Sequence, residues 1–241
     1  MGRTFENRRL AMLKRGLRDS KAFTRCGRHI AMAVRAGGPD PDGNPALRRA
    51  IQNARAANMP KDKIQGAIDK ASGAGNEENY EEILYEGYGP HGVALMVETT
   101  TDNPTRTVAN VRFAFNKGNG NLGNSGSVSF MFDQFGYFRF APEGIECEEL
   151  ELELIESGLE EMLDAEGDKG EPLIEVRCAR DEFGNLQTGL DEKKIEVLSS
   201  GFVWVPKTTT ELDDAQTDEV LKLVERLEQD DDVQEVFTNL G

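Results

Sequence analysis

The spacing of apolar residues predicts a series of short helices over the first seventy residues. Leu10, Leu13 and Leu17 recur at three- and four-residue intervals, which predicts a helix over residues 6–19. A second helix is expected from about residue 20 to residue 35, and its apolar side consists of Phe23, Cys26, Ile30 and Val34.

Two proline signals predict further helices. Asn44-Pro45 and Met59-Pro60 each place a proline in a first helical turn, where its missing N–H costs nothing. Apolar residues continue at helical spacing after both prolines, as far as Gly73. Residues 1–72 are therefore predicted to form an all-helical domain.

The pattern changes character after residue 79. Glycines and a proline at 87–92 predict a break, and the β-branched run at 93–101 predicts a strand. Asn103-Pro104 then predicts the start of a helix over 104–117. The alternation of Val128, Phe130 and Phe132 predicts a further strand over 127–132.

The remaining elements favour an α+β fold in which one unit is inserted in another. Residues 135–205 are interpreted as strand-helix-strand-strand-helix-strand, including strands at 173–178 and 202–205 and a helix at about 185–200. A strand at 208–212, a helix at 213–229 and a strand at 233–240 follow. The predicted fold class is thus an all-helical domain, 1–72, followed by two ferredoxin-like α+β units. Residues 80–134 pair with 206–241 in the first unit, and residues 135–205 form the inserted second unit.

Charge divides the chain in the same place as the pattern. The formal net charge is −16, from 28 Lys and Arg against 44 Asp and Glu. Residues 1–70 hold 16 basic and 6 acidic groups, a balance of +10, whereas residues 71–241 hold 12 basic and 38 acidic groups, a balance of −26. This asymmetry predicts that the helical domain meets a polyanion.

Clustered arginine and lysine side chains are the candidate nucleic-acid contacts, because each neutralised phosphate releases counterions. Ten of them fall within the first 35 residues, beside two acidic residues. The alternative interpretation is a solubilising surface on a small helical bundle. The predicted nucleic-acid-binding residues are Arg3, Arg8, Arg9, Lys14, Arg15, Arg18, Lys21, Arg25, Arg28 and Arg35.

Four long motifs resemble one family. They are Ala-Asn-Met-Pro-Lys-Asp from residue 57, Tyr-Glu-Gly-Tyr-Gly-Pro-His-Gly-Val-Ala from residue 85, Thr-Asp-Asn-Pro-Thr-Arg-Thr-Val from residue 101, and Gly-Asn-Leu-Gly-Asn-Ser-Gly-Ser-Val-Ser-Phe-Met-Phe from residue 120. In this order they resemble the YebC/PmpR family of probable transcriptional regulators, which includes the mitochondrial translational activator of cytochrome oxidase. The resemblance implies nucleic-acid contact through the helical N-terminal domain.

Motifs that would indicate catalysis or a cofactor lack the flanking elements or the further residues that such sites require. The Gly-x-Gly-x-x-Gly run at 118–123 follows a predicted helix and precedes a strand, the reverse of a dinucleotide site. The Asp40-x-Asp42-x-Asn44 pattern lacks the glycine and glutamate of a calcium loop. His91 is interpreted as a loop residue, with ligand contact as the alternative. We therefore expect no catalytic residue, no metal and no cofactor, and no enzyme; an enzyme with a pocket between the two α+β units is the weakest hypothesis.

The sequence also bears on location and partners. Cys26, Cys147 and Cys178 lie far apart, which favours a reducing compartment, and no apolar run reaches the length of a membrane span. A cytoplasmic protein without membrane contact is expected. The leading hypothesis is a transcriptional regulator that binds DNA, and the alternative is a translational activator that contacts ribosomal RNA on the ribosome. Phosphate contacts look the same in both cases, so the sequence does not separate them.

Overall fold

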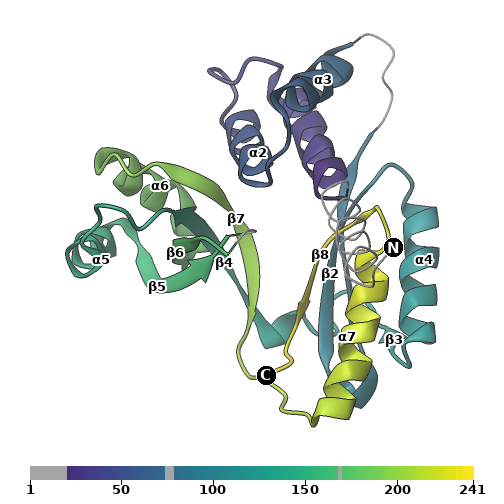
Figure 1. The fold of residues 1–241 in the computed structure, drawn as a ribbon. Helices are drawn as coiled ribbons and strands as arrows, with labels where there is room; N and C mark the ends of the chain where they lie inside the picture. The colour runs from purple at the N-terminus through teal and green to yellow at the C-terminus, as the bar shows by residue number, and fades with distance from the viewer. Residues whose placement is uncertain (1–20, 74–78, 168–169) are drawn as a thin grey trace, which may run out of the picture. The chain divides into compact units, whose positions relative to one another are not determined.

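A computed structural model describes residues 21–73, 79–167 and 170–241 of the chain (Figure 1). The chain divides into two compact units, Met1–Tyr80 and Glu81–Gly241. The predicted helix over residues 6–19 lies outside the described residues. No helix in the described ranges combines the length and the apolar composition that crossing a membrane requires.

Three helices form the described part of the first unit. They cover residues 21–37, Pro45–Ala56 (α2) and Lys61–Ser72 (α3), which confirms the helices predicted over these stretches. The side chain of Asn44 caps α2 by accepting the N–H of Leu47, and proline follows it as expected. The buried core of the unit includes Ile30, Val34, Leu47, Ile51, Ile64 and Ile68.

The second unit begins with a four-stranded antiparallel sheet of order β3-β1-β2-β8. Helices α4 and α7 pack on one of its faces (Figure 1), around a core that includes Phe115 and Leu223. The elements are β1 (Glu81–Tyr88), β2 (Ala94–Thr101), α4 (Pro104–Lys117), β3 (Asn121–Leu122), α7 (Asp214–Glu228) and β8 (Val233–Thr238), with a 3-10 turn, η1, at Pro90–Gly92.

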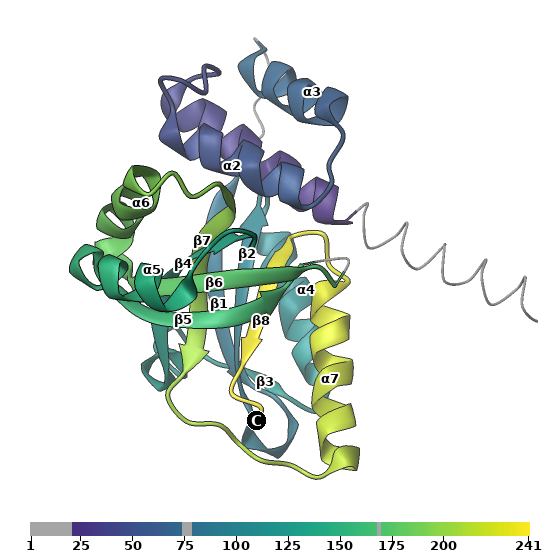
Figure 2. The same cartoon turned by 60° about the vertical axis from the view of Figure 1, so that its left-hand side comes forward.

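A second antiparallel sheet, of order β5-β6-β4-β7, lies between β3 and α7 in the sequence. Its elements follow the predicted strand-helix-strand-strand-helix-strand order, and Figure 2 shows α5 and α6 beside the sheet. They are β4 (Phe132–Phe140), α5 (Cys147–Leu154), β5 (Leu159–Glu166), β6 (Pro172–Ala179), α6 (Phe183–Glu192) and β7 (Val197–Pro206), with 3-10 turns η3 (Ile155–Ser157) and η4 (Arg180–Glu182). The predicted fold class is confirmed, whereas the domain boundaries given above stay a prediction.

Several element predictions were wrong. Residues 127–131 form a bend and the 3-10 helix η2 (Ser129–Met131), because the carboxylate of Glu86 holds the backbone N–H groups that a partner strand would otherwise take. The first sheet instead gains β1, which was not predicted and which includes Gly87 and Tyr88 of the expected break.

Two further predictions differ from the structure. The helix predicted to residue 200 ends at Glu192, since Lys194 adopts a left-handed backbone conformation with φ 57°. The strand predicted at 208–212 is reduced to one bridge between Thr210 and Leu240.

Candidate nucleic-acid interface

The helix over residues 21–37 carries its basic and apolar residues on opposite sides. At 100° per residue, Lys21, Arg25, Arg28 and Arg35 fall within an arc of roughly 80°. The buried residues Ile30 and Val34 lie about half a turn away. Fourteen residues separate the first and last of the four cations, so the row extends for roughly 21 Å along the helix. We call these four side chains the basic stripe.

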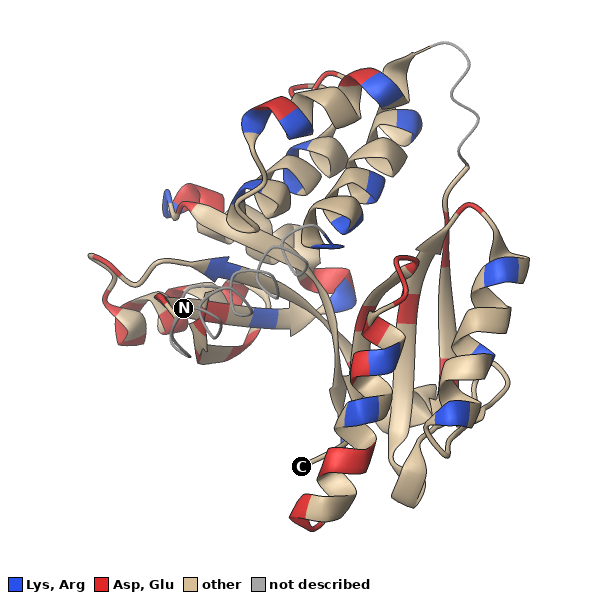
Figure 3. Cartoon of the chain, turned by 45° about the vertical axis from the view of Figure 1, so that its right-hand side comes forward, with Lys and Arg blue, Asp and Glu red and all other residues tan. Residues whose placement is uncertain are grey.

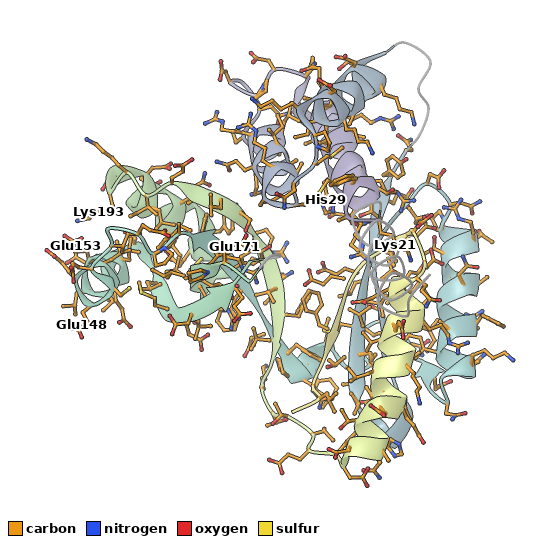
Figure 4. All side chains as sticks on the ribbon, in the orientation of Figure 1. Lys21, His29, Glu148, Glu153, Glu171 and Lys193 are labelled. Atoms are coloured by element: carbon orange, nitrogen blue, oxygen red, sulfur yellow. The ribbon has the colours of Figure 1, made fainter. Side chains whose placement is uncertain are left out.

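The structure thus brings together the four predicted site residues that it describes. The other six, Arg3, Arg8, Arg9, Lys14, Arg15 and Arg18, lie outside the described residues. Figure 4 labels Lys21 on this helix.

Two members of the basic stripe contact the end of the first unit. The guanidinium of Arg28 lies over the ring of Tyr80, 5.5 Å from its centroid. Arg35 donates from Nη1 to Oδ1 of Asn79 at 2.9 Å. Two of the predicted cations are therefore already engaged, one by an aromatic ring and one by an oxygen acceptor.

Further basic residues extend the positive charge of the unit beyond the predicted set. Residues 21–73 contain ten Lys and Arg against four Asp and Glu, and Figure 3 shows them on all three described helices. Arg48 and Arg55 of α2, and Lys63 and Lys70 of α3, are pairs seven residues apart, which places each pair on one side of its helix. The six residues that sequence reasoning did not name are Arg48, Arg49, Arg55, Lys61, Lys63 and Lys70. Proline-marked helix starts and the charge count are the signals that could have named them.

Asn44 positions the helix of the basic stripe against α2. This residue is 3% exposed, and its Nδ2 donates to the backbone oxygens of Ala33 at 2.7 Å and Gly38 at 2.9 Å. Its Oδ1 accepts from the N–H of Leu47 at 3.0 Å. One amide therefore joins the end of the first helix to the start of the next, which fixes where their cations lie.

The second unit is rich in Asp and Glu, which Figure 3 shows in red along its helices and strands. Two of its buried carboxylates bind other parts of the same unit. The buried Asp232 accepts from Arg106 Nη2 at 2.8 Å and from Thr107 Oγ1 at 2.7 Å, which ties the start of α4 to the start of β8. The buried Glu86 accepts backbone N–H bonds from Gly126, Val128 and Ser129, each at 2.8 Å. The motif that begins at Tyr85 therefore contacts the motif that begins at Gly120. The motif that begins at Thr101 contacts Asp232.

The other candidate motifs have structural explanations. The glycine run at 118–123 caps the end of α4 and leads into β3, so its order is helix then strand as expected. His91 has a positive φ of 61° and lies 3.0 Å from Glu219 through Nε2, so the turn contacts α7. Within the described ranges, no three His, Cys, Asp or Glu side chains gather as a metal site requires.

Comparisons with known proteins cover nearly the whole chain. A family model described as the TACO1/YebC protein N-terminal domain matches residues 3–74, and one described as the TACO1/YebC second and third domain matches residues 80–240. A probable transcriptional regulatory protein of Anaeromyxobacter dehalogenans is 56% identical over all of both chains. One of Myxococcus xanthus is 54% identical, again over all of both chains.

A solved structure agrees with this pattern. The crystal structure of a conserved hypothetical protein from Aquifex aeolicus matches with a TM-score of 0.78 at 38% sequence identity. The match covers 92% of this chain and 90% of that chain.

Proposed function

Because this chain belongs to the TACO1/YebC family, we propose that it is a regulatory protein that binds DNA through the basic side of its N-terminal helical unit. The observation that carries the proposal is the basic stripe, in which four cations line one side of a helix whose other side is buried. The names of its relatives, probable transcriptional regulatory proteins, support a role in transcription.

The physical basis of binding is phosphate neutralisation. A row of cations about 21 Å long runs past several phosphates of a duplex, and each ion pair formed there displaces condensed counterions. The rest of the chain has the opposite charge, so it repels the same polyanion and leaves the helical unit as the favourable contact. On this proposal the protein is a regulator rather than an enzyme, and it acts in the cytoplasm, in keeping with its three cysteines, which form no disulfide.

Charge reversal tests the proposal. The variant Lys21→Glu/Arg25→Glu removes two stripe cations that are distinct from those contacting Asn79 and Tyr80. We expect its Kd for a 20-base-pair duplex, measured by fluorescence anisotropy, to rise at least tenfold, with the slope of log K against log salt reduced by about 2.

The matched control is Arg112→Glu/Lys222→Glu, which makes the same change in net charge on exposed positions of α4 and α7. Its binding should stay within about twofold of the unmodified protein. Equal weakening by both variants would mean that only net charge matters, and the proposed interface would be rejected.

A translational role is the second candidate. The positions along the basic stripe are Lys21, Arg25, Arg28, Met32 and Arg35, so this side of the helix has no carboxamide of the kind that pairs with adenine edges. Such a surface suits the backbone of a folded ribosomal RNA as well as that of DNA. Cross-linking in cells, followed by sequencing of the bound nucleic acid, distinguishes the two roles. Recovery of discrete promoter fragments supports transcription, and recovery of ribosomal RNA supports translation.

A further inference from the structure

We propose that Asn79 and Tyr80 are a built-in competitor for the basic stripe, occupying two of its cations in the way that a nucleic acid would. The inference rests on the proposed function and concerns how that same surface is regulated. It starts from two contacts of the basic stripe, Arg28 with Tyr80 and Arg35 with Asn79.

The chemistry of the two contacts matches that of a nucleotide. A guanidinium stacked on an aromatic ring is also how arginine holds an unpaired base, and Tyr80 supplies that ring 5.5 Å from Arg28. A guanidinium N–H that donates to an oxygen is how arginine holds a phosphate, and Asn79 supplies that oxygen 2.9 Å from Arg35. Adjacent residues of the chain therefore present a ring and an acceptor to cations seven residues apart on one helix side.

Competition of this kind is weak by design, because neither competing residue is charged. A neutral acceptor and a half-buried cation–π contact each lower the affinity for a competing ligand by roughly threefold. A phosphate backbone, which is charged and repeats, displaces both groups once several other cations are engaged. The competitor thus discriminates against short or isolated anions and yields to an extended polyanion.

The test compares the full-length protein with Asn79→Ala/Tyr80→Ala, and uses Tyr80→Phe as the control that keeps the ring. The probes are a 20-base-pair DNA duplex and an RNA hairpin of the same charge, at several salt concentrations. We expect the double variant to bind each probe three- to tenfold more tightly than the unmodified protein does. The slope of log K against log salt should be unchanged, because no charge was altered. Tyr80→Phe should bind as the unmodified protein does. Circular dichroism confirms that each variant is folded.

A second measurement reads the contact directly. Nuclear magnetic resonance of the Arg28 side chain should show a ring-current shift that is absent in Tyr80→Ala, retained in Tyr80→Phe, and lost when the DNA duplex, which has no unpaired base, saturates the protein. Affinity that is unchanged or weaker in the double variant, or a ring-current shift that persists in the complex saturated with the duplex, overturns the inference while the proposed function stands. If the unmodified protein binds neither probe, the proposed function fails first and the inference fails with it.

Discussion

Glu86 is an ionised side chain enclosed by the fold, with 4% of its surface exposed. Burial acts to raise its pKa, but the backbone N–H groups of Gly126, Val128 and Ser129 oppose this, and the pKa is lowered overall. A group with a lowered pKa stabilises the fold above its unfolded pKa, and this contribution is lost as pH falls through the folded value.

We predict that Glu86→Gln lowers the free energy of unfolding by about 2–3 kcal/mol at pH 7. The glutamine side chain is uncharged, and its NH2 group cannot accept a hydrogen bond from a backbone N–H, so the three bonds to Glu86 are weakened or lost. The difference from the unmodified protein should shrink in urea titrations below about pH 4. Glu81→Gln, at an exposed position of the same strand, should change stability by no more than about 0.5 kcal/mol. A gap that stays constant down to pH 3 would contradict the role of the charge.

Arg106 and Asp232 form a pair in which only one partner is enclosed. Asp232 has 3% of its side chain exposed, whereas Arg106 has 44%. We predict that Arg106→Met lowers the free energy of unfolding by about 3 kcal/mol, since it leaves a buried carboxylate without its counter-charge. Asp102→Asn, which removes the exposed 2.7 Å partner of the same guanidinium, should cost less than about 1 kcal/mol. Thermal and urea unfolding measure both, and similar losses would show that the burial of Asp232 is not the cause.

Helix junctions are the elements that the sequence predicts best, and one of them permits a direct test. We predict that Asn44→Ala destabilises the helical unit by about 2 kcal/mol, since it removes a cap and two further bonds to backbone oxygens. Hydrogen exchange should quicken over residues 21–37 and in α2 and stay unchanged over 81–241. Gln65→Ala, which removes an exposed side-chain hydrogen bond within α3, should change the opening free energy measured by hydrogen exchange by less than about 0.5 kcal/mol. Equal effects in the two variants would deny Asn44 its special position.

The distance in sequence between a residue and its partners explains which elements were predicted and which were missed. Asn44 and Asn103 each cap a helix through a residue three positions away, so their signals are local and were identified. Asp213 caps α7 in the same way, but the sequence analysis predicted only the helix and not its cap. Strand β1 was missed because its Glu86 points a charge inward, and the N–H groups that justify this lie some 40 residues further along.

The candidate site shows the same division between local and distant information. Helical periodicity predicts that Lys21, Arg25, Arg28 and Arg35 share one side of a helix, because the spacing alone determines it. The contact between Arg35 and Asn79 joins residues 44 positions apart, and no local pattern encodes such a contact.

At the scale of the molecule, the two sheets of residues 81–241 meet at the protein's single tryptophan. Trp204 packs against an apolar cluster that includes Met96 and Phe237, and its Nε1 donates to Oε1 of Glu98 at 2.8 Å. Burial raises the pKa of Glu98, and the bond from Trp204 opposes the shift only in part. A raised pKa means that Glu98 favours the folded state when protonated and that this contribution is lost as pH rises through its folded pKa.

We predict a step in Trp204 emission above the ordinary glutamate pKa of about 4.3, as Glu98 gains its proton. The step should vanish in Glu98→Gln, whose emission is expected to be flat over this range. Since the chain has one tryptophan, the emission comes from Trp204 alone. Persistence of the step in Glu98→Gln would assign it to another group.

The pairing of Phe132 with Pro206, extended by the bond from Lys207 N to Met131 O at 2.9 Å, means that the second sheet is entered and left through neighbouring strands. Such a junction is a natural insertion site. A foreign domain whose own ends lie one strand spacing apart, about 5 Å, can replace the second sheet there without a change in the path of the chain on either side. Insertions and deletions among family members are therefore expected between residues 132 and 206, and a sensor or affinity tag is best inserted at the same junction.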